Sequence, residues 1–163
     1  MSEIVVQKFG GTSVGTVDRI DSVAEIIKNA SKSNKIVVVV SAMGGETNRL
    51  VDLAKAFGDD PDKREFDALV STGETVSSAL LTMALHSKGI KAKSFSASQI
   101  SMRTTSSYSK AKILDVDAKK ILDVIDSDTI PIITGFQGVT EGGDVTTLGR
   151  GGSDTTAVAI AAQ

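Results

Sequence analysis

The chain has 163 residues, of which 40% are apolar and only 4% aromatic, with a formal net charge of −2 and no cysteine. This length is enough for one domain with a sizeable core, which must be mostly aliphatic. The mixed charge argues against a nucleic-acid partner, and the lack of cysteine excludes disulfides, thiolate metal sites and cysteine nucleophiles.

The start of the chain predicts a β-α-β unit. Continuous β-branched runs at 4–6 and 36–40 indicate strands covered on both faces, as in a parallel sheet. Between them, apolar residues at helical spacing predict a helix with Thr16 as its N-cap. An acid near the N-terminus and short apolar runs predict neither a signal peptide nor a membrane span. We therefore expect a cytoplasmic protein with no membrane partner.

Helices and strands continue to alternate along the rest of the chain. The polar stretch 99–112 stays open between strands and a loop, and Met83 fits a helix core. The last helix shows no stop signal before Gln163, which suggests that it is cut short. The further expected elements are helices at 48–58, 59–74, 74–89 (ended by Gly89) and 117–128 (capped by Asp117), strands at 91–97 and 129–136, and a helix from 154.

Alternating strands and helices predict an α/β fold with a mainly parallel sheet and helices on both faces. Ligands of such sheets bind at the carboxyl ends of the strands. Glycine-rich or hydroxylated loops follow the expected strands there, at residues 8–13, 41–48 and 135–138. Bare backbone N–H groups and helix N-termini in loops of this kind suit an anion.

Lys8 stands at the end of the first buried strand, where an ammonium is costly unless it meets an anion. A lysine that reaches solvent or pairs with a structural carboxylate is the competing interpretation. Gly10 and Gly11 favour a functional role, because glycine here indicates a sharp turn or a ligand close to the backbone. Neither a Walker A loop nor a G-x-G-x-x-G loop is present.

A second glycine-rich stretch, "GRGGSD", opens the last expected helix. Its Arg150 suits bidentate binding of a carboxylate, against the alternative of a solvated loop arginine. Ser153 or Asp154 is the natural N-cap of this helix. Glu74 is first interpreted as a first-turn glutamate favoured by the helix dipole, with acceptance of a ligand ammonium as the alternative. No metal-ligand spacing exists, so any metal would arrive with a nucleotide.

Five blocks in this order, "VVQKFGGTSV", "VVVVSAMGGETNRL", "LVSTGETVSSALL", "ITGFQGV" and "DVTTLGRGGSDTTAVAIAAQ", resemble the aspartate kinases of the amino acid kinase family. The resemblance implies a three-layer αβα sandwich with a carbamate kinase-like fold, here truncated. It also implies transfer of a phosphoryl group from ATP, with Mg²⁺ held mainly through the nucleotide, to L-aspartate. The products would be ADP and 4-phospho-L-aspartate, in the first step of lysine, threonine and methionine biosynthesis.

The resemblance assigns one set of residues to phosphoryl transfer. Lys8 would neutralise the charge that develops on the transferred group, and Asp154 would position Lys8. The residues implied along the phosphate path are Gly10, Gly11 and Ser41.

A second set would bind the amino acid. Glu74 would hold the substrate ammonium, and Arg150 would bind the α-carboxylate, with Ser153 nearby. Thr47 would touch the substrate as well.

Members of the family continue well beyond this length, so residues 1–163 resemble only the N-terminal portion of the kinase domain, without the nucleotide-binding portion and the regulatory domains. We therefore keep three hypotheses: an aspartate kinase fragment that is weak or inactive alone, a non-catalytic aspartate-binding or assembly module, and another small-molecule kinase of the same fold. Because a truncated sheet leaves an apolar face and an unpaired edge, we also expect a homo-oligomer.

Overall fold

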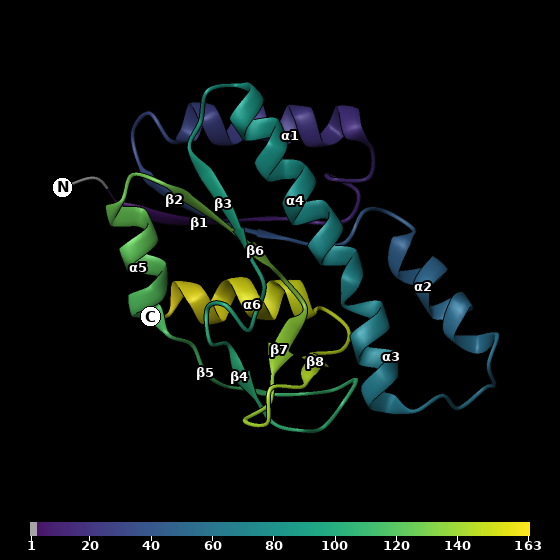
Figure 1. Cartoon of the computed structure of the whole chain (residues 1–163). Helices are drawn as coiled ribbons and strands as arrows, with labels where there is room; N and C mark the ends of the chain where they lie inside the picture. The colour runs from purple at the N-terminus through teal and green to yellow at the C-terminus, as the bar shows by residue number, and fades with distance from the viewer. Residues whose placement is uncertain (1–2) are drawn as a thin grey trace.

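The main sheet of the protein contains four parallel strands. The computed structural model describes residues 3–163. Its strands β1 (Ile4–Phe9), β2 (Lys35–Val40), β6 (Ile130–Thr134) and β3 (Ala92–Phe95) lie side by side in that order (Figure 1). Because every pair is parallel, the carboxyl ends of the strands meet at one edge of the sheet. The β-branched run of β2 is buried, as predicted, and so is β6. The prediction that the run 4–6 is covered on both faces is wrong, because β1 is an edge strand and Ile4 is 44% exposed.

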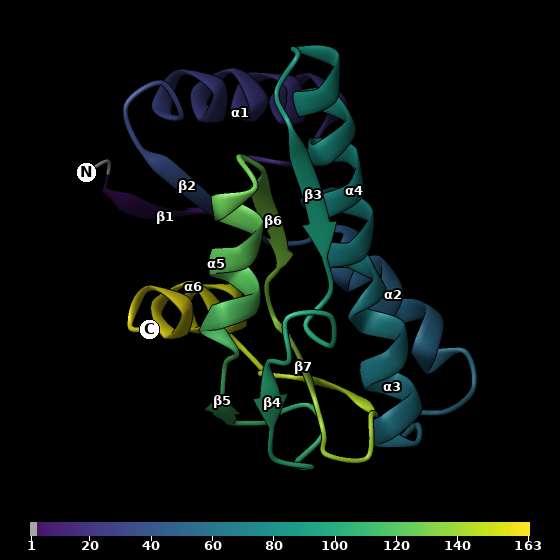
Figure 2. The same cartoon turned by 60° about the vertical axis from the view of Figure 1, so that its left-hand side comes forward.

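Helices cover both faces of this sheet. Helices α1 (Val17–Ala30) and α4 (Thr72–Ser87) lie on one face, and α5 (Ala118–Asp126) and α6 (Gly152–Ala161) lie on the other (Figures 1 and 2). Each face has its own aliphatic core cluster, rich in buried isoleucine and valine, with leucine only on the face of α1 and α4. The predicted αβα sandwich with a mainly parallel sheet is therefore confirmed. The expectation for Met83 is wrong, because its side chain is 63% exposed on α4.

The predicted helix boundaries have clear local causes. The hydroxyl of Thr16 accepts a hydrogen bond from the backbone N–H of Arg19 at 3.2 Å, which caps α1 as expected. Asp117 caps α5 in the same way. Gly89 follows α4 with a φ of +75°, a conformation that glycine adopts at no steric cost.

Helices α2 (Glu46–Lys55) and α3 (Lys63–Val70) extend beyond the carboxyl edge of the main sheet (Figure 1). Asp62 caps α3, which passes into α4 at Ser71. Within the described part of the chain, the run Lys63–Ser87 is long and apolar enough to cross a membrane by length and composition alone. Half of its most apolar window is buried inside the domain, and a single run of this kind is weak evidence of a membrane span.

A second, smaller sheet lies beyond the end of β6, and the sequence did not predict it as a unit. It contains the short strands β4 (Arg103–Thr104), β5 (Ile113–Asp115), β7 (Gln137–Val139) and β8 (Val145–Thr147), in the order β5-β4-β7-β8. The polar stretch that stayed open in the sequence supplies β4 and the loop after it. Figure 2 shows β4, β5 and β7 below the main sheet, away from α1.

Candidate active site

A cavity of about 610 Å³ opens where β1 and β2 end. It brings together residues that lie far apart in the sequence, from the loops after both strands, the first turn of α4 and the loop before α6. The predicted site residues that line it are Lys8, Gly11, Ser41, Thr47, Glu74, Arg150, Ser153 and Asp154. Gly10 is the predicted site residue that does not line it.

Lys8 and Asp154 form an ion pair at the edge of this cavity. The Nζ of Lys8 lies 2.9 Å from Oδ1 of Asp154, and the two side chains are 28% and 70% exposed. A pair this exposed contributes little to stability, so its main effect is to fix the direction of the ammonium. A Cβ at Gly10 would lie 3.3 Å from the Nζ of Lys8. Glycine at this position therefore leaves room for the lysine head group.

Close packing of two loops explains other glycines near the cavity. A Cβ on Gly11 would lie 3.0 Å from the carbonyl oxygen of Ala42, and a Cβ on Gly44 would lie 3.3 Å from the carbonyl oxygen of Gly11. The loops after β1 and β2 can approach this closely only without side chains. Their glycines thus have a packing role in addition to any contact with a ligand.

Two helices begin at the cavity after a left-handed glycine. Gly45 (φ +83°) precedes α2, and Gly151 (φ +73°) precedes α6. The first N–H groups of a helix have no partner within it and carry partial positive charge. Both helix N-termini therefore favour an anion in the cavity, as the sequence predicted for this edge of the sheet.

Glu74 is buried, with 3% of its surface exposed, in the first turn of α4. Its Oε1 accepts a hydrogen bond from the backbone N–H of Ala42 at 3.2 Å, whereas its Oε2 has no hydrogen-bond partner. Burial raises the pKa of the Glu74 carboxyl to about 7, against hydrogen bonds from backbone N–H groups that lower it. A buried carboxylate oxygen without a partner, in the wall of a cavity, can receive a cationic group.

Arg150 lies on the loop between β8 and α6, between Gly149 (φ +81°) and Gly151. The side chain lines the cavity but remains exposed, and within residues 3–163 it forms no salt bridge. A Cβ at Gly149 would lie 3.1 Å from the carbonyl oxygen of Ser109. The glycine therefore lets this loop pass close to Ser109.

The expectation that Ser153 or Asp154 caps α6 is wrong. The helix begins at Gly152, with Gly151 as its N-cap and no side-chain cap. The side chain of Ser153 packs against Gly135, where a Cβ would lie 2.6 Å from its Oγ. The side chain of Asp154 pairs with Lys8. Both side chains thus face neighbouring segments and leave the helix end to glycine.

Several lining residues were missed in the sequence. Phe136 lines the cavity with a φ of +70°, a strained conformation for a residue with a side chain. Its loop was recognised, but no signal singled out the aromatic residue. Ser109 and Thr147 also line the cavity, and Asp67 lies fully buried behind them. The sequence hint for Asp67 is its spacing from Val70, which places the acid on an apolar helix face.

Comparison with known proteins agrees with this fold along the whole described chain. The model of the amino acid kinase family matches residues 3–163. An aspartate kinase of Stutzerimonas stutzeri is 55% identical over 160 residues, which are 98% of this chain and 39% of that protein. An aspartokinase of Geobacillus stearothermophilus shows the same identity and coverage. The chain thus spans about two fifths of the length of these curated relatives.

Solved structures give the same result. E. coli aspartokinase III, in complex with aspartate and ADP, superposes on this chain with a TM-score of 0.87 and 29% sequence identity. The match covers 98% of this chain and 46% of the E. coli chain. Aspartate kinase from Synechocystis has a TM-score of 0.81 at 45% identity and covers 99% of this chain and 26% of its own. The chain belongs to the amino acid kinase family.

Proposed function

We propose that this chain carries the amino-acid and phosphate-binding part of an aspartate kinase. The observation that carries the proposal is that one cavity is lined by Lys8, Arg150 and the buried Glu74, whose Oε2 has no partner. An acceptor for an ammonium, a donor for a carboxylate and a cation for a phosphate are the groups that this reaction requires.

Glu74 and Arg150 recognise the α-amino-acid end of the substrate. The ammonium binds at Oε2 of Glu74 and completes the hydrogen bonding of a carboxylate that the fold leaves half satisfied. The guanidinium of Arg150 binds the α-carboxylate through two parallel N–H donors. With that end fixed, a side chain of aspartate length presents its carboxylate to the phosphate. Thr47 and Ser153, which also line the cavity, complete the amino-acid side of the site.

The proposed transfer needs no general base. An oxygen of the side-chain carboxylate, already ionised, attacks the γ-phosphorus of ATP. The bond from that phosphorus to the β,γ-bridging oxygen breaks, and the electron pair leaves with ADP. Lys8, held by Asp154, neutralises charge on the transferred group. Phosphate oxygens bind to the backbone N–H of Gly11 and to the N–H groups at the N-termini of α2 and α6. Ser41 lies beside them.

ATP and a divalent cation, Mg²⁺ by preference, are the expected co-reactants. The residues that the structure describes contain no group of three or more side chains of the kinds that hold a metal ion. We therefore place the cation on the phosphates of the nucleotide. Bound there, it neutralises phosphate charge.

Binding of L-aspartate to the complete gene product tests the substrate assignment. Isothermal titration calorimetry should give a measurable affinity for L-aspartate and a weaker one for N-acetylglutamate, whose amine carries no charge. Glu74→Gln and Arg150→Ala should each weaken L-aspartate binding. Unchanged affinity in both variants would refute the assignment, and preference for N-acetylglutamate would indicate another small-molecule kinase of this fold.

Release of ADP in a coupled assay tests catalysis. Aspartate-dependent ADP release supports a kinase, while aspartate binding without ADP release indicates the non-catalytic module. The 163-residue chain alone is expected to be weak or inactive in the same assay. Robust turnover by the chain alone would contradict its assignment as the N-terminal portion of a longer kinase domain.

We further propose that the protein works in the cytoplasm as a homo-oligomer. The cysteine-free composition suits a reducing compartment. The exposed apolar side chains of Leu114 and Val158 line one hollow of the surface together, and contiguous apolar surface is often covered in assemblies. Light scattering tests the second part: a mass twofold or more above the monomer is expected, and a monodisperse monomer would contradict it.

A further inference from the structure

Asp67, in the middle of α3, is fully buried and accepts four hydrogen bonds. Its Oδ2 accepts from the backbone N–H groups of Ser109 and Thr147, both at 2.8 Å. Its Oδ1 accepts from the hydroxyls of the same two residues, both at 3.0 Å. One carboxylate thus joins three segments of the chain: α3, the loop after β4, and β8.

These bonds fix the base of the loop that carries Arg150. Thr147, the last residue of β8, stands three positions before Arg150, and its carbonyl oxygen accepts from the N–H of Ala111 at 3.0 Å. The carbonyl of Ser109 lies against Gly149, where a Cβ would come within 3.1 Å. Asp67 therefore fixes both the end of β8 and the neighbouring loop at Ser109, and the loop that carries Arg150 starts at this point.

The same aspartate is tied to the other end of the amino-acid site. Its carbonyl oxygen accepts from the N–H of Ser71 at 3.1 Å, and Ser71 joins α3 to α4. Glu74 follows in the first turn of α4. A short, hydrogen-bonded helical path thus connects Asp67 to the carboxylate that faces the cavity.

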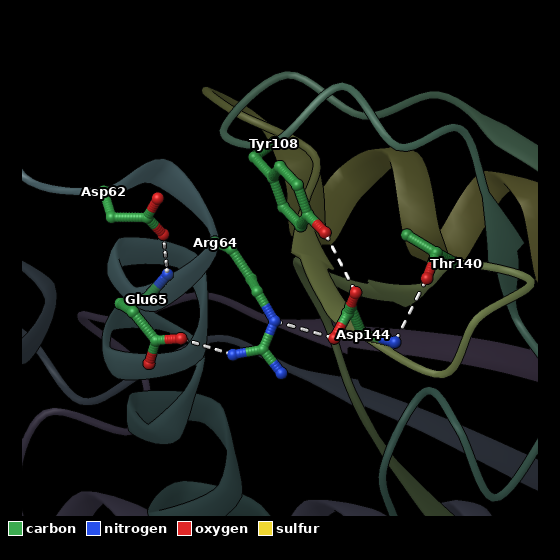
Figure 3. A network of polar contacts seen from close by, with 6 residues as sticks. All are labelled: Asp62, Arg64, Glu65, Tyr108, Thr140 and Asp144. Atoms are coloured by element: carbon green, nitrogen blue, oxygen red, sulfur yellow. Dashed lines mark hydrogen bonds and ion pairs between the residues drawn. The ribbon is translucent and has the colours of Figure 1, made fainter.

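A second link between α3 and the small sheet lies at the surface (Figure 3). The Nε of Arg64 donates to Oδ1 of Asp144 at 2.8 Å, and the hydroxyl of Tyr108 donates to Oδ2 at 3.1 Å. This link also joins α3 to the loop after β4 and to the residue just before β8, but it is exposed and does not line the main cavity. Arg64 therefore offers a matched control.

We propose that Asp67 is a positioning residue that sets the separation between Glu74 and Arg150, and so makes the site selective for ligands that carry both an ammonium and an α-carboxylate. This inference rests on the proposed function. Asp67 touches no ligand itself; it acts through Ser109 and Thr147. A ligand with only one of the two groups does not depend on the separation.

The experiment compares three ligands in the complete gene product by calorimetry: L-aspartate, succinate, which lacks the ammonium, and β-alanine, which lacks the α-carboxylate. In Asp67→Asn, an amide replaces one of two oxygens that now accept from N–H groups and hydroxyls. Its affinity for L-aspartate should fall about 10- to 100-fold, as when a hydrogen-bonded charge is removed. Affinities for succinate and β-alanine should change less than about threefold, and Arg64→Ala should leave all three within that range.

Different outcomes overturn different claims. An equal loss for all three ligands, or no loss for L-aspartate, would show that Asp67 serves only the fold. If Asp67→Asn does not fold, Ser109→Ala removes one of the four donors, and a loss of about 3- to 10-fold confined to L-aspartate is expected. A uniform or absent loss there also overturns the inference. If the unaltered protein does not prefer L-aspartate over both analogues, the proposed function itself fails.

Discussion

Glu74 and Arg150 line the same cavity, yet the chain holds them in different ways. Glu74 is buried in a helix, with one oxygen bonded to the backbone and the other without a partner. Arg150 is exposed on a loop between left-handed glycines. The carboxylate therefore loses its water during folding, whereas the exposed guanidinium keeps its water until a ligand binds. The carboxylate is preformed, whereas on the positive side Asp67 fixes the base of the loop and only the exposed side chain of Arg150 adapts.

Substitution of Lys8, the third charged residue of the cavity, should have the largest effect on activity. In Lys8→Ala, turnover should fall about 10³-fold, since the charge on the transferred group loses its stabilising cation. L-Aspartate affinity should stay within about threefold, because Glu74 and Arg150 remain. Steady-state kinetics in the complete gene product check this. Lys35→Ala, which removes a strand lysine paired with Asp126 at 3.0 Å, serves as the control and should retain full turnover. Equal rates in both variants would contradict the role.

Substitution of Arg150 should have the next largest effect, on the affinity for L-aspartate. Arg150→Ala should weaken L-aspartate binding about 100-fold, through loss of a bidentate charge-assisted contact. Arg150→Lys should recover only part of that loss, because an ammonium cannot make two parallel hydrogen bonds. Because Arg150 forms no ion pair in the described chain, the melting temperature should not change. Calorimetry measures the L-aspartate affinity, and thermal unfolding measures the melting temperature. Arg103→Ala, which removes an exposed arginine outside the cavity, is the control and should leave the affinity unchanged. Full recovery by lysine would argue against bidentate binding.

The buried carboxylate of Glu74 should lower the free energy of unfolding. Since the pKa of Glu74 is about 7 in the folded state against 4.5 ordinarily, the unfolded chain loses this proton first as pH rises. Stability therefore falls between about pH 4.5 and 7, by about 3 kcal/mol at most. Glu74→Gln should raise the free energy of unfolding by about 1–3 kcal/mol at pH 8 and change it little at pH 4.

Urea unfolding of the ligand-free protein at both pH values measures this difference. Glu141→Gln, at an exposed position, should change neither value and controls for the loss of a charge. A Glu74→Gln variant that is less stable than the unaltered protein at pH 8 would show that the buried carboxylate does not destabilise the fold.

The smallest effect is expected at Asp154. Asp154→Asn should change the free energy of unfolding by less than about 1 kcal/mol, because its ion pair with Lys8 is largely exposed. Turnover should nevertheless fall, since the ammonium loses the partner that directs it. Urea unfolding and kinetics of the same sample separate the two effects. A variant with normal turnover would show that Lys8 needs no positioning.

The sequence predicted what local physics determines. Helix caps such as Thr16 and Asp117, and the buried runs of β2 and β6, follow from side-chain chemistry within a few residues. Lys8 could be placed at the carboxyl edge because it ends an expected strand, whereas the site roles of Glu74 and Asp154 were given only by the resemblance to the aspartate kinases.

Long-range contacts decided the rest. The small sheet has strands of two or three residues, too short for a period, and Asp67 ties it to α3. The cap of α6 was predicted wrongly because Ser153 and Asp154 face partners far along the chain, Gly135 and Lys8. Met83 was placed in the core because composition alone does not show which face of α4 is exposed.

In the proposed site, the free oxygen of Glu74 receives the substrate ammonium. The most direct test is a pH titration of the Glu74 carboxyl by ¹³C NMR in the complete gene product, with Glu74→Gln to identify its signal. The pKa of Glu74 should be about 7 without ligand and should fall clearly when L-aspartate is bound, because a nearby ammonium favours the ionised form. A pKa near 4.5 without ligand, or one that L-aspartate leaves unmoved, would contradict this role of Glu74.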